Sequence, residues 1–133
     1  MRVSFVIILM ALAFCSCSDN TKQEKDQLNA ILKVHDKVMD NDDVLMKSKM
    51  KLDSLLKVKT IKDTTEIKAL DVKLAAAEDS MEDWMHKFEP DPAGKSHDEI
   101  MQYHSDQKKQ IMAVDSVMNQ AIGEANQYFS NHK

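Results

Sequence analysis

A chain of 133 residues is the size of one ordinary domain, and it carries only 2 Gly and 2 Pro among 30% charged residues. All-β sandwiches and doubly wound sheets need a turn roughly every ten residues, so these classes are excluded and long helices remain. The net charge is −4, the two signs are interspersed, and Arg2 is the only arginine. Nucleic-acid-binding proteins concentrate basic charge and favour arginine, so we expect no nucleic-acid partner.

The N-terminus has the features of a bacterial lipoprotein signal. A positive charge precedes an apolar run, Val3–Phe14, which is too short to span a bilayer as a permanent helix. The run leads to Cys15 and Cys17, and the small Ser16 directly before Cys17 makes Cys17 the better acceptor for a diacylglyceryl group. We therefore predict a lipoprotein signal peptide at residues 1–16. An ordinary secretory signal cut at a nearby site is the alternative.

Lipidation would decide both the cysteine chemistry and the location of the chain. Cleavage discards Cys15 and lipidation consumes Cys17, which leaves no thiol for a disulfide, a nucleophile or a metal ligand. Several acyl chains on one residue anchor a protein stably in a membrane. We expect export and lipid anchoring in the cell envelope, at the outer membrane, with residues 17–25 as the lipidated Cys and a polar tether.

The remaining residues, 26–133, are predicted to form a helical bundle whose first helix covers about 22–58. Its apolar residues recur at intervals of three and four, which is typical of one face of a helix. They are Leu28, Ile31, Leu32, Val38, Met39, Leu45, Met46, Leu52, Leu55 and Leu56. Three polar residues interrupt this stripe at seven-residue spacing: His35, Asp42 and Lys49.

The second helix is predicted over about 63–88, after a segment at Thr60–Glu66 that suits a helix interior poorly. We predict a tight hairpin turn near Asp63, and one continuous helix over Leu28–Phe88 is the alternative. The second helix has an unbroken three-four pattern typical of coiled-coil or bundle packing. The pattern consists of Ile67, Leu70, Leu74, Ala77, Met81, Trp84 and Phe88.

The third helix is predicted over about 96–129. The loop before it holds both prolines and a glycine within Pro90–Gly94, and Ser96 with Glu99 has the spacing of a capping box. Three helices of similar length predict an all-α, up-down-up antiparallel three-helix bundle with coiled-coil-like packing.

Two motifs resemble a known family. His35-Asp36-Lys37-Val38-Met39 lies on the first helix, and Glu82-Asp83-Trp84-Met85-His86-Lys87-Phe88 closes the second. This combination is similar to small helical lipoproteins typical of Bacteroidota, which are often labelled "viral A-type inclusion protein". The resemblance covers most of the mature chain and implies a helical hairpin plus a third helix on a lipid anchor. That group has no assigned reaction, cofactor or catalytic residue.

Side chains that can bind metal gather at one end of the predicted bundle. Residues equidistant from a hairpin turn lie side by side, which puts His35, His97, Met101 and His104 in one layer with Trp84. Imidazole and thioether groups facing a bundle interior suit copper, or an axially ligated haem where there is more room. The favoured interpretation is core packing, because Met fills irregular gaps and a buried His commonly bonds a neighbour. A metal site is the alternative.

The sequence contains no His-Glu-x-x-His, Gly-x-Ser-x-Gly or nucleotide-binding glycine motif. We expect a non-enzymatic, lipid-anchored envelope protein that acts through contacts with an unknown protein partner or as a structural element. No cofactor and no small-molecule substrate is expected. A periplasmic or surface copper- or haem-binding protein is the alternative.

Overall fold

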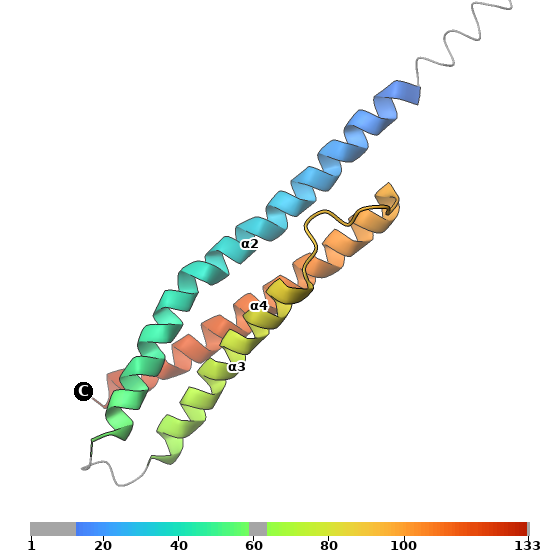
Figure 1. The fold of residues 1–133 in the computed structure, drawn as a ribbon. Helices are drawn as coiled ribbons and strands as arrows, with labels where there is room; N and C mark the ends of the chain where they lie inside the picture. Colours follow the sequence, from blue (N-terminus) through green and yellow to red (C-terminus); the bar gives the residue numbers. More distant parts are fainter. Residues whose placement is uncertain (1–12, 59–63, 133) are drawn as a thin grey trace, which may run out of the picture.

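The computed structural model describes residues 13–58 and 64–132, with side chains from Asp19 onward. Its helices are α2 (Ala13–Leu56), α3 (Thr65–Lys87) and α4 (His97–Asn131). Figure 1 shows α2 running from the upper right to the lower left, α3 returning beside it, and α4 running back to the C-terminus. The prediction of an all-α, up-down-up three-helix bundle is confirmed.

Helix α2 begins earlier than the sequence predicts. Residues 17–25, expected to form a polar tether, are part of this helix, which starts at Ala13. The stretch contains neither Pro nor Gly, and Gln23 Nε2 donates a hydrogen bond to Asp19 Oδ2, one turn earlier, over 3.3 Å. Nothing in these residues ends the helix, so it continues without a break into the core.

The first two predicted helices are separate and antiparallel, so the alternative of one continuous helix is wrong. Helix α2 ends at Leu56 and α3 begins at Thr65. The two helices are joined by an ion pair between Lys49 Nζ and the Glu78 carboxylate. The predicted turn near Asp63 lies outside the described residues.

The core follows a seven-residue repeat. In α2, Ile31, Val38, Leu45 and Leu52 are all fully buried and lie seven residues apart, as in coiled coils. The buried residues of α3 are those of its predicted pattern, with Phe88 half-buried beyond its end. Helix α4 contributes His104, Gln107, Ile111, Val114, Met118, Ala121, Ile122, Ala125, Tyr128 and Phe129.

Part of the predicted apolar stripe of α2 is on the surface. Leu32, Met39 and Met46 are 37%, 40% and 41% exposed. Each follows a fully buried core residue, which turns it about 100° around the helix, out of the core. Helix α2 packs more extensively against α4 than against α3. The two helices together bury only part of the apolar stripe of α2, and these three residues lie outside that part.

Helix α3 is the shortest of the three. Its 23 residues span about 35 Å, against about 66 Å for the 44 residues of α2 and about 52 Å for the 35 of α4. Beyond the end of α3, the chain crosses to α4 in a loop where Gly94 has a φ of +81°. Ser96 and Glu99 then form the predicted capping box. No helix in residues 13–58 and 64–132 is sufficiently long and apolar to cross a membrane.

Candidate functional site

A row of aromatic rings crosses the bundle near the end where α3 gives way to the loop. The His35 ring of α2 lies 6.0 Å from Trp84, which stacks on Phe88 with the ring centroids 4.6 Å apart. Phe88 in turn lies 6.5 Å from Tyr103 of α4 in a parallel arrangement, and Tyr103 lies 5.9 Å from His104. These rings pack all three helices together where α3 ends.

The row also fixes the start of the loop. The Glu89 backbone N–H donates a hydrogen bond to Tyr103 Oη over 2.7 Å. This bond satisfies a backbone donor directly after α3 and ties the loop to α4. Tyr103 was not among the predicted site residues, although an aromatic residue beside a predicted inward histidine is a signal that could have indicated it.

His97, at the first position of α4, is joined to α2. Its Nδ1 lies 2.7 Å from Glu24 Oε1, and both side chains are about three-quarters buried. Glu24 falls in the segment predicted to be a tether, and its contact with a residue so far along the chain leaves no local signal in the sequence. The pair holds the early part of α2 against the start of α4.

His104 is the most buried of the predicted ligands. It is 2% exposed, and neither ring nitrogen has a hydrogen-bond partner among the described residues. Burial lowers the pKa of His104, and the negative charge of Glu24 acts in the opposite direction. Burial thus favours the neutral ring, which has one donor and one acceptor, and neither is paired among the described residues.

A hollow of about 280 Å³ lies between the early part of α2, the loop and α4. Apolar side chains form much of its wall, including Leu28, Pro92 and Ile100, and Glu24 and His104 line it as well. It occupies the space beyond the C-terminal end of α3, into which a longer α3 would extend. Its volume lies slightly below the usual range for small-molecule sites, about 300–1,000 Å³.

The structure does not bring the predicted metal ligands to one point. His97 is engaged by Glu24, and His104 follows seven residues later, about 10 Å along α4, with half-buried Met101 between them. His35 is on the side of α2 that faces α3. Across the part of the chain that the structure describes, no group of three or more His, Cys, Asp or Glu could hold a metal ion. Copper or haem binding by this layer stays a prediction.

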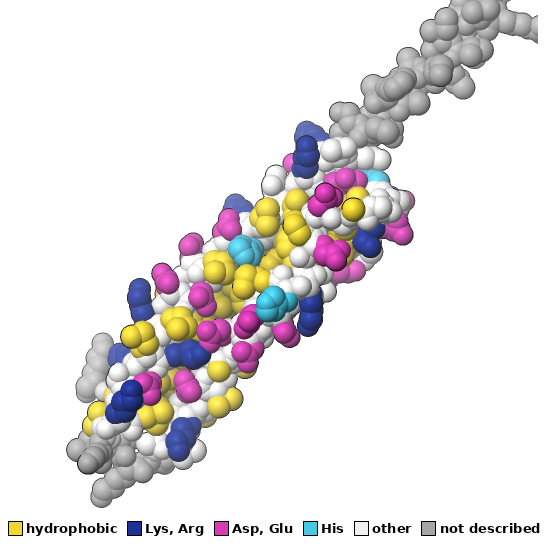
Figure 2. Space-filling view, in the orientation of Figure 1, with side chains coloured by type: hydrophobic (Ala, Val, Ile, Leu, Met, Phe, Trp, Pro, Cys, Tyr) yellow, Lys and Arg dark blue, Asp and Glu magenta, His cyan; other side chains and the backbone are white. Residues whose placement is uncertain are grey.

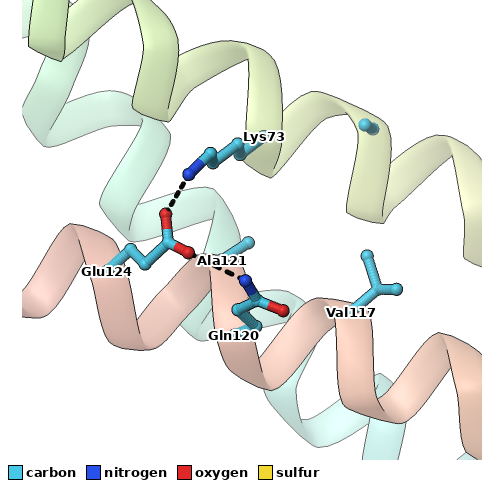
Figure 3. A pocket seen from close by; sticks show the side chains of 6 residues that line it. Lys73, Val117, Gln120, Ala121 and Glu124 are labelled. Carbon is cyan, nitrogen blue, oxygen red and sulfur yellow. Dashed lines mark hydrogen bonds and ion pairs between the residues drawn. The ribbon is translucent and has the colours of Figure 1, made fainter.

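A second hollow, of about 190 Å³, lies along the seam between α3 and α4 (Figure 3). Its floor is apolar, with Val117 and Ala121 pointing into the seam, and Lys73 reaches across from α3 to pair with Glu124 of α4. Gln120 Nε2 also donates to Glu124 over 3.0 Å. The hydrogen bond from Lys73, followed by that from Gln120, lowers the pKa of Glu124. Lys73 and Gln120 both bond Glu124, so these polar groups help to hold α3 against α4.

The predicted lipidation site lies at the N-terminal end of α2. Cys17 is in the first turns of α2, and its side chain is outside the part of the structure that is described. Most of the predicted signal peptide, residues 1–12 of 1–16, also lies outside the described residues. Lipidation at Cys17 stays a prediction from the sequence.

Comparison with protein-family models, with curated proteins and with solved structures finds no match for this chain. The resemblance to the small helical lipoproteins therefore stays a prediction based on two short motifs.

Proposed function

We propose that this chain is a lipid-anchored protein of the bacterial cell envelope that acts through protein contacts and not as an enzyme. The observation that carries the proposal is the apolar Val3–Phe14 segment ending in Ser16-Cys17, the pattern of a lipoprotein signal. Its outer-membrane location and its protein partner belong to the same proposal.

The surface of the bundle supports action through contacts. Methionine and other large apolar side chains stand exposed on all three helices, including Met50, Val72 and Met112. Methionine is common at binding surfaces because its flexible, polarizable side chain adapts to partners of different shape. In the α3–α4 hollow, by contrast, Lys73 and Gln120 are already bonded to Glu124, so the hollow offers a partner fewer free polar groups.

The anchor is tested by expressing the chain in a bacterium and comparing two cysteine variants. Cys17→Ser should abolish labelling by a palmitate analogue and move the protein out of the membrane fraction. Cys15→Ser is the matched control and should leave both unchanged, because signal cleavage would remove that residue. Lipid labelling that survives Cys17→Ser would overturn the proposal.

Copper binding is the second candidate function, and one observation favours it. Both ring nitrogens of His104 are unpaired among the described residues, and half-buried Met101 lies one turn earlier on α4. Calorimetric titration of the purified protein with Cu(I) tests this candidate. One tight equivalent that is lost in the His104→Ala variant would support copper binding. Absence of binding heat in the wild type would reject it.

A further inference from the structure

Exposed apolar side chains gather where α2 and α3 lie side by side. Leu32, Met39 and Met46 follow one another at seven-residue intervals along α2, and Met85 of α3 is 41% exposed. Figure 2, which views α2 and α3 from the front, shows hydrophobic side chains grouped over these helices and acidic side chains beside them. We call these four residues the α2–α3 face.

The register between the helices places the members of the face together. Lys49 pairs with Glu78, and the helices are antiparallel. Seven residues beyond Glu78, Met85 lies on the same side of α3 and at the height of residue 42 of α2. Met39 is three residues from that height, about 4.5 Å along α2, so the two methionines are at neighbouring levels of the bundle.

Carboxylates border the face on both helices. They are Asp36, Asp42 and Asp43 on α2 and Glu78 and Glu82 on α3, all exposed or half-buried. Glu78 is paired with Lys49, and Asp36 Oδ1 lies 3.1 Å from His35 Nδ1. The other three form no ion pair or hydrogen bond within the described ranges. The border therefore carries an excess of negative charge.

We propose that the α2–α3 face docks a basic amphipathic helix of a partner protein. A seven-residue repeat of apolar side chains along one helix matches another helix lying beside it. The carboxylates at its border select Lys and Arg on the flanks of that helix, and the methionines adapt to its apolar side chains. This inference deepens the proposed function and rests on it for action through protein contacts.

The probe is a synthetic helical peptide of about 20 residues, with leucine along one face and Lys and Arg on both flanks. The comparison peptide keeps the leucines and carries Glu in place of the basic residues. Fluorescence anisotropy with the full chain in a zwitterionic detergent measures both affinities. We expect the basic peptide to bind at least about tenfold more tightly, with an affinity that falls as salt is added.

Two double variants separate the apolar and charged parts of the face. Met39→Gln/Met85→Gln should weaken binding of the basic peptide roughly tenfold, because both methionines become polar at the centre of the face. Asp42→Asn/Glu82→Gln should reduce both the affinity and its salt dependence. The matched control, Met112→Gln, alters one exposed methionine of α4 and should leave the affinity unchanged. All these residues are exposed or half-buried, and circular dichroism checks that each variant stays helical.

Three results would overturn the proposal: equal affinity for the two peptides, no binding of either, or a control variant that weakens binding as much as Met39→Gln/Met85→Gln. A fourth concerns a second copy of this chain as the occupant. If sedimentation shows a dimer that Met39→Gln/Met85→Gln dissociates, the face is a self-association surface. The anchor is measured by membrane fractionation of Cys17→Ser, so failure of the docking proposal is distinguishable from failure of the lipid anchor.

Discussion

Replacing His104 by leucine is expected to stabilise the protein. His104 is 2% exposed and belongs to the buried face of α4, yet neither ring nitrogen has a hydrogen-bond partner among the described residues. A buried polar atom left unpaired costs about 1–3 kcal/mol. Leucine has a similar size and no polar atom, so His104→Leu keeps the packing and removes this cost.

The expected increase in the free energy of unfolding is therefore at least about 1–3 kcal/mol, the cost of one of the two unpaired nitrogens. For a domain of this size, each kcal/mol raises Tm by roughly 3–6 °C. Urea unfolding followed by circular dichroism measures the free energy, and a thermal scan at pH 7.5 gives the Tm. His86→Leu is the matched control, since His86 is exposed on α3 and its replacement should change stability by no more than about 0.5 kcal/mol.

A loss of stability in His104→Leu would refute the reasoning. It would mean that the ring nitrogens are satisfied in solution, by bound water or by an ion, and that the ring contributes more than leucine can. A gain would indicate that the chain carries a destabilising histidine in its core. Such a cost is typical of residues retained for function, which would direct attention to the hollow that His104 lines.

The other predictions concern the rest of the fold. Ser96→Ala removes the capping box of α4 and should lower the free energy of unfolding by about 1 kcal/mol in a urea titration; an unchanged midpoint would contradict the cap's role. Gly123→Ala should raise Tm, with a gain of roughly 0.5–1 kcal/mol, because Gly123 is exposed within α4 and an added Cβ meets nothing within 4 Å; a lower Tm would show an unseen clash. Leu74→Ala should cost about 2–5 kcal/mol, since Leu74 is fully buried, and a loss below 1 kcal/mol would argue against the described core. Finally, the pKa of His104 is lowered in the fold, so the unfolded chain binds more protons than the folded one as the pH falls below the ordinary histidine pKa of about 6.5. Tm should therefore fall between pH 7.5 and 5.5, and it should fall less in His104→Leu. Equal pH dependence of Tm in the two proteins would assign the effect to other groups.

Periodicity was sufficient to predict the helices and most of the core. The three-four pattern of the second predicted helix, from Ile67 to Trp84, is the buried face of α3. The prolines and Gly94 located the loop, and Ser96 with Glu99 located the start of α4 within a residue. These features depend on residues that are close in sequence, where spacing determines geometry.

Tertiary relations were less predictable. The exposure of Met39 depends on how much of α2 its neighbours cover, which the apolar spacing of one helix does not reveal. The contact between Glu24 and His97 depends on the register of two helices far apart in the chain. Gln107 and Tyr128 are buried although neither residue type by itself predicts a core position. For the candidate site, the sequence indicated a layer rich in His and Met. It did not indicate that His35 lies against Trp84, that His97 pairs with Glu24, or that His104 is buried without a hydrogen-bond partner among the described residues.

The continuity of α2 has a mechanical consequence. Under the proposed attachment at Cys17, the lipidated residue and the core belong to one rigid rod, with no flexible spacer between them. Met39 would then stand roughly 30 Å along that rod from the lipid. A partner in the same membrane would meet a binding surface already held at a set distance from the bilayer, and it would lose less orientational freedom on docking than with a swinging domain. Inserting a Gly-Ser spacer after Asn20 would lengthen the reach of the bundle but weaken that advantage.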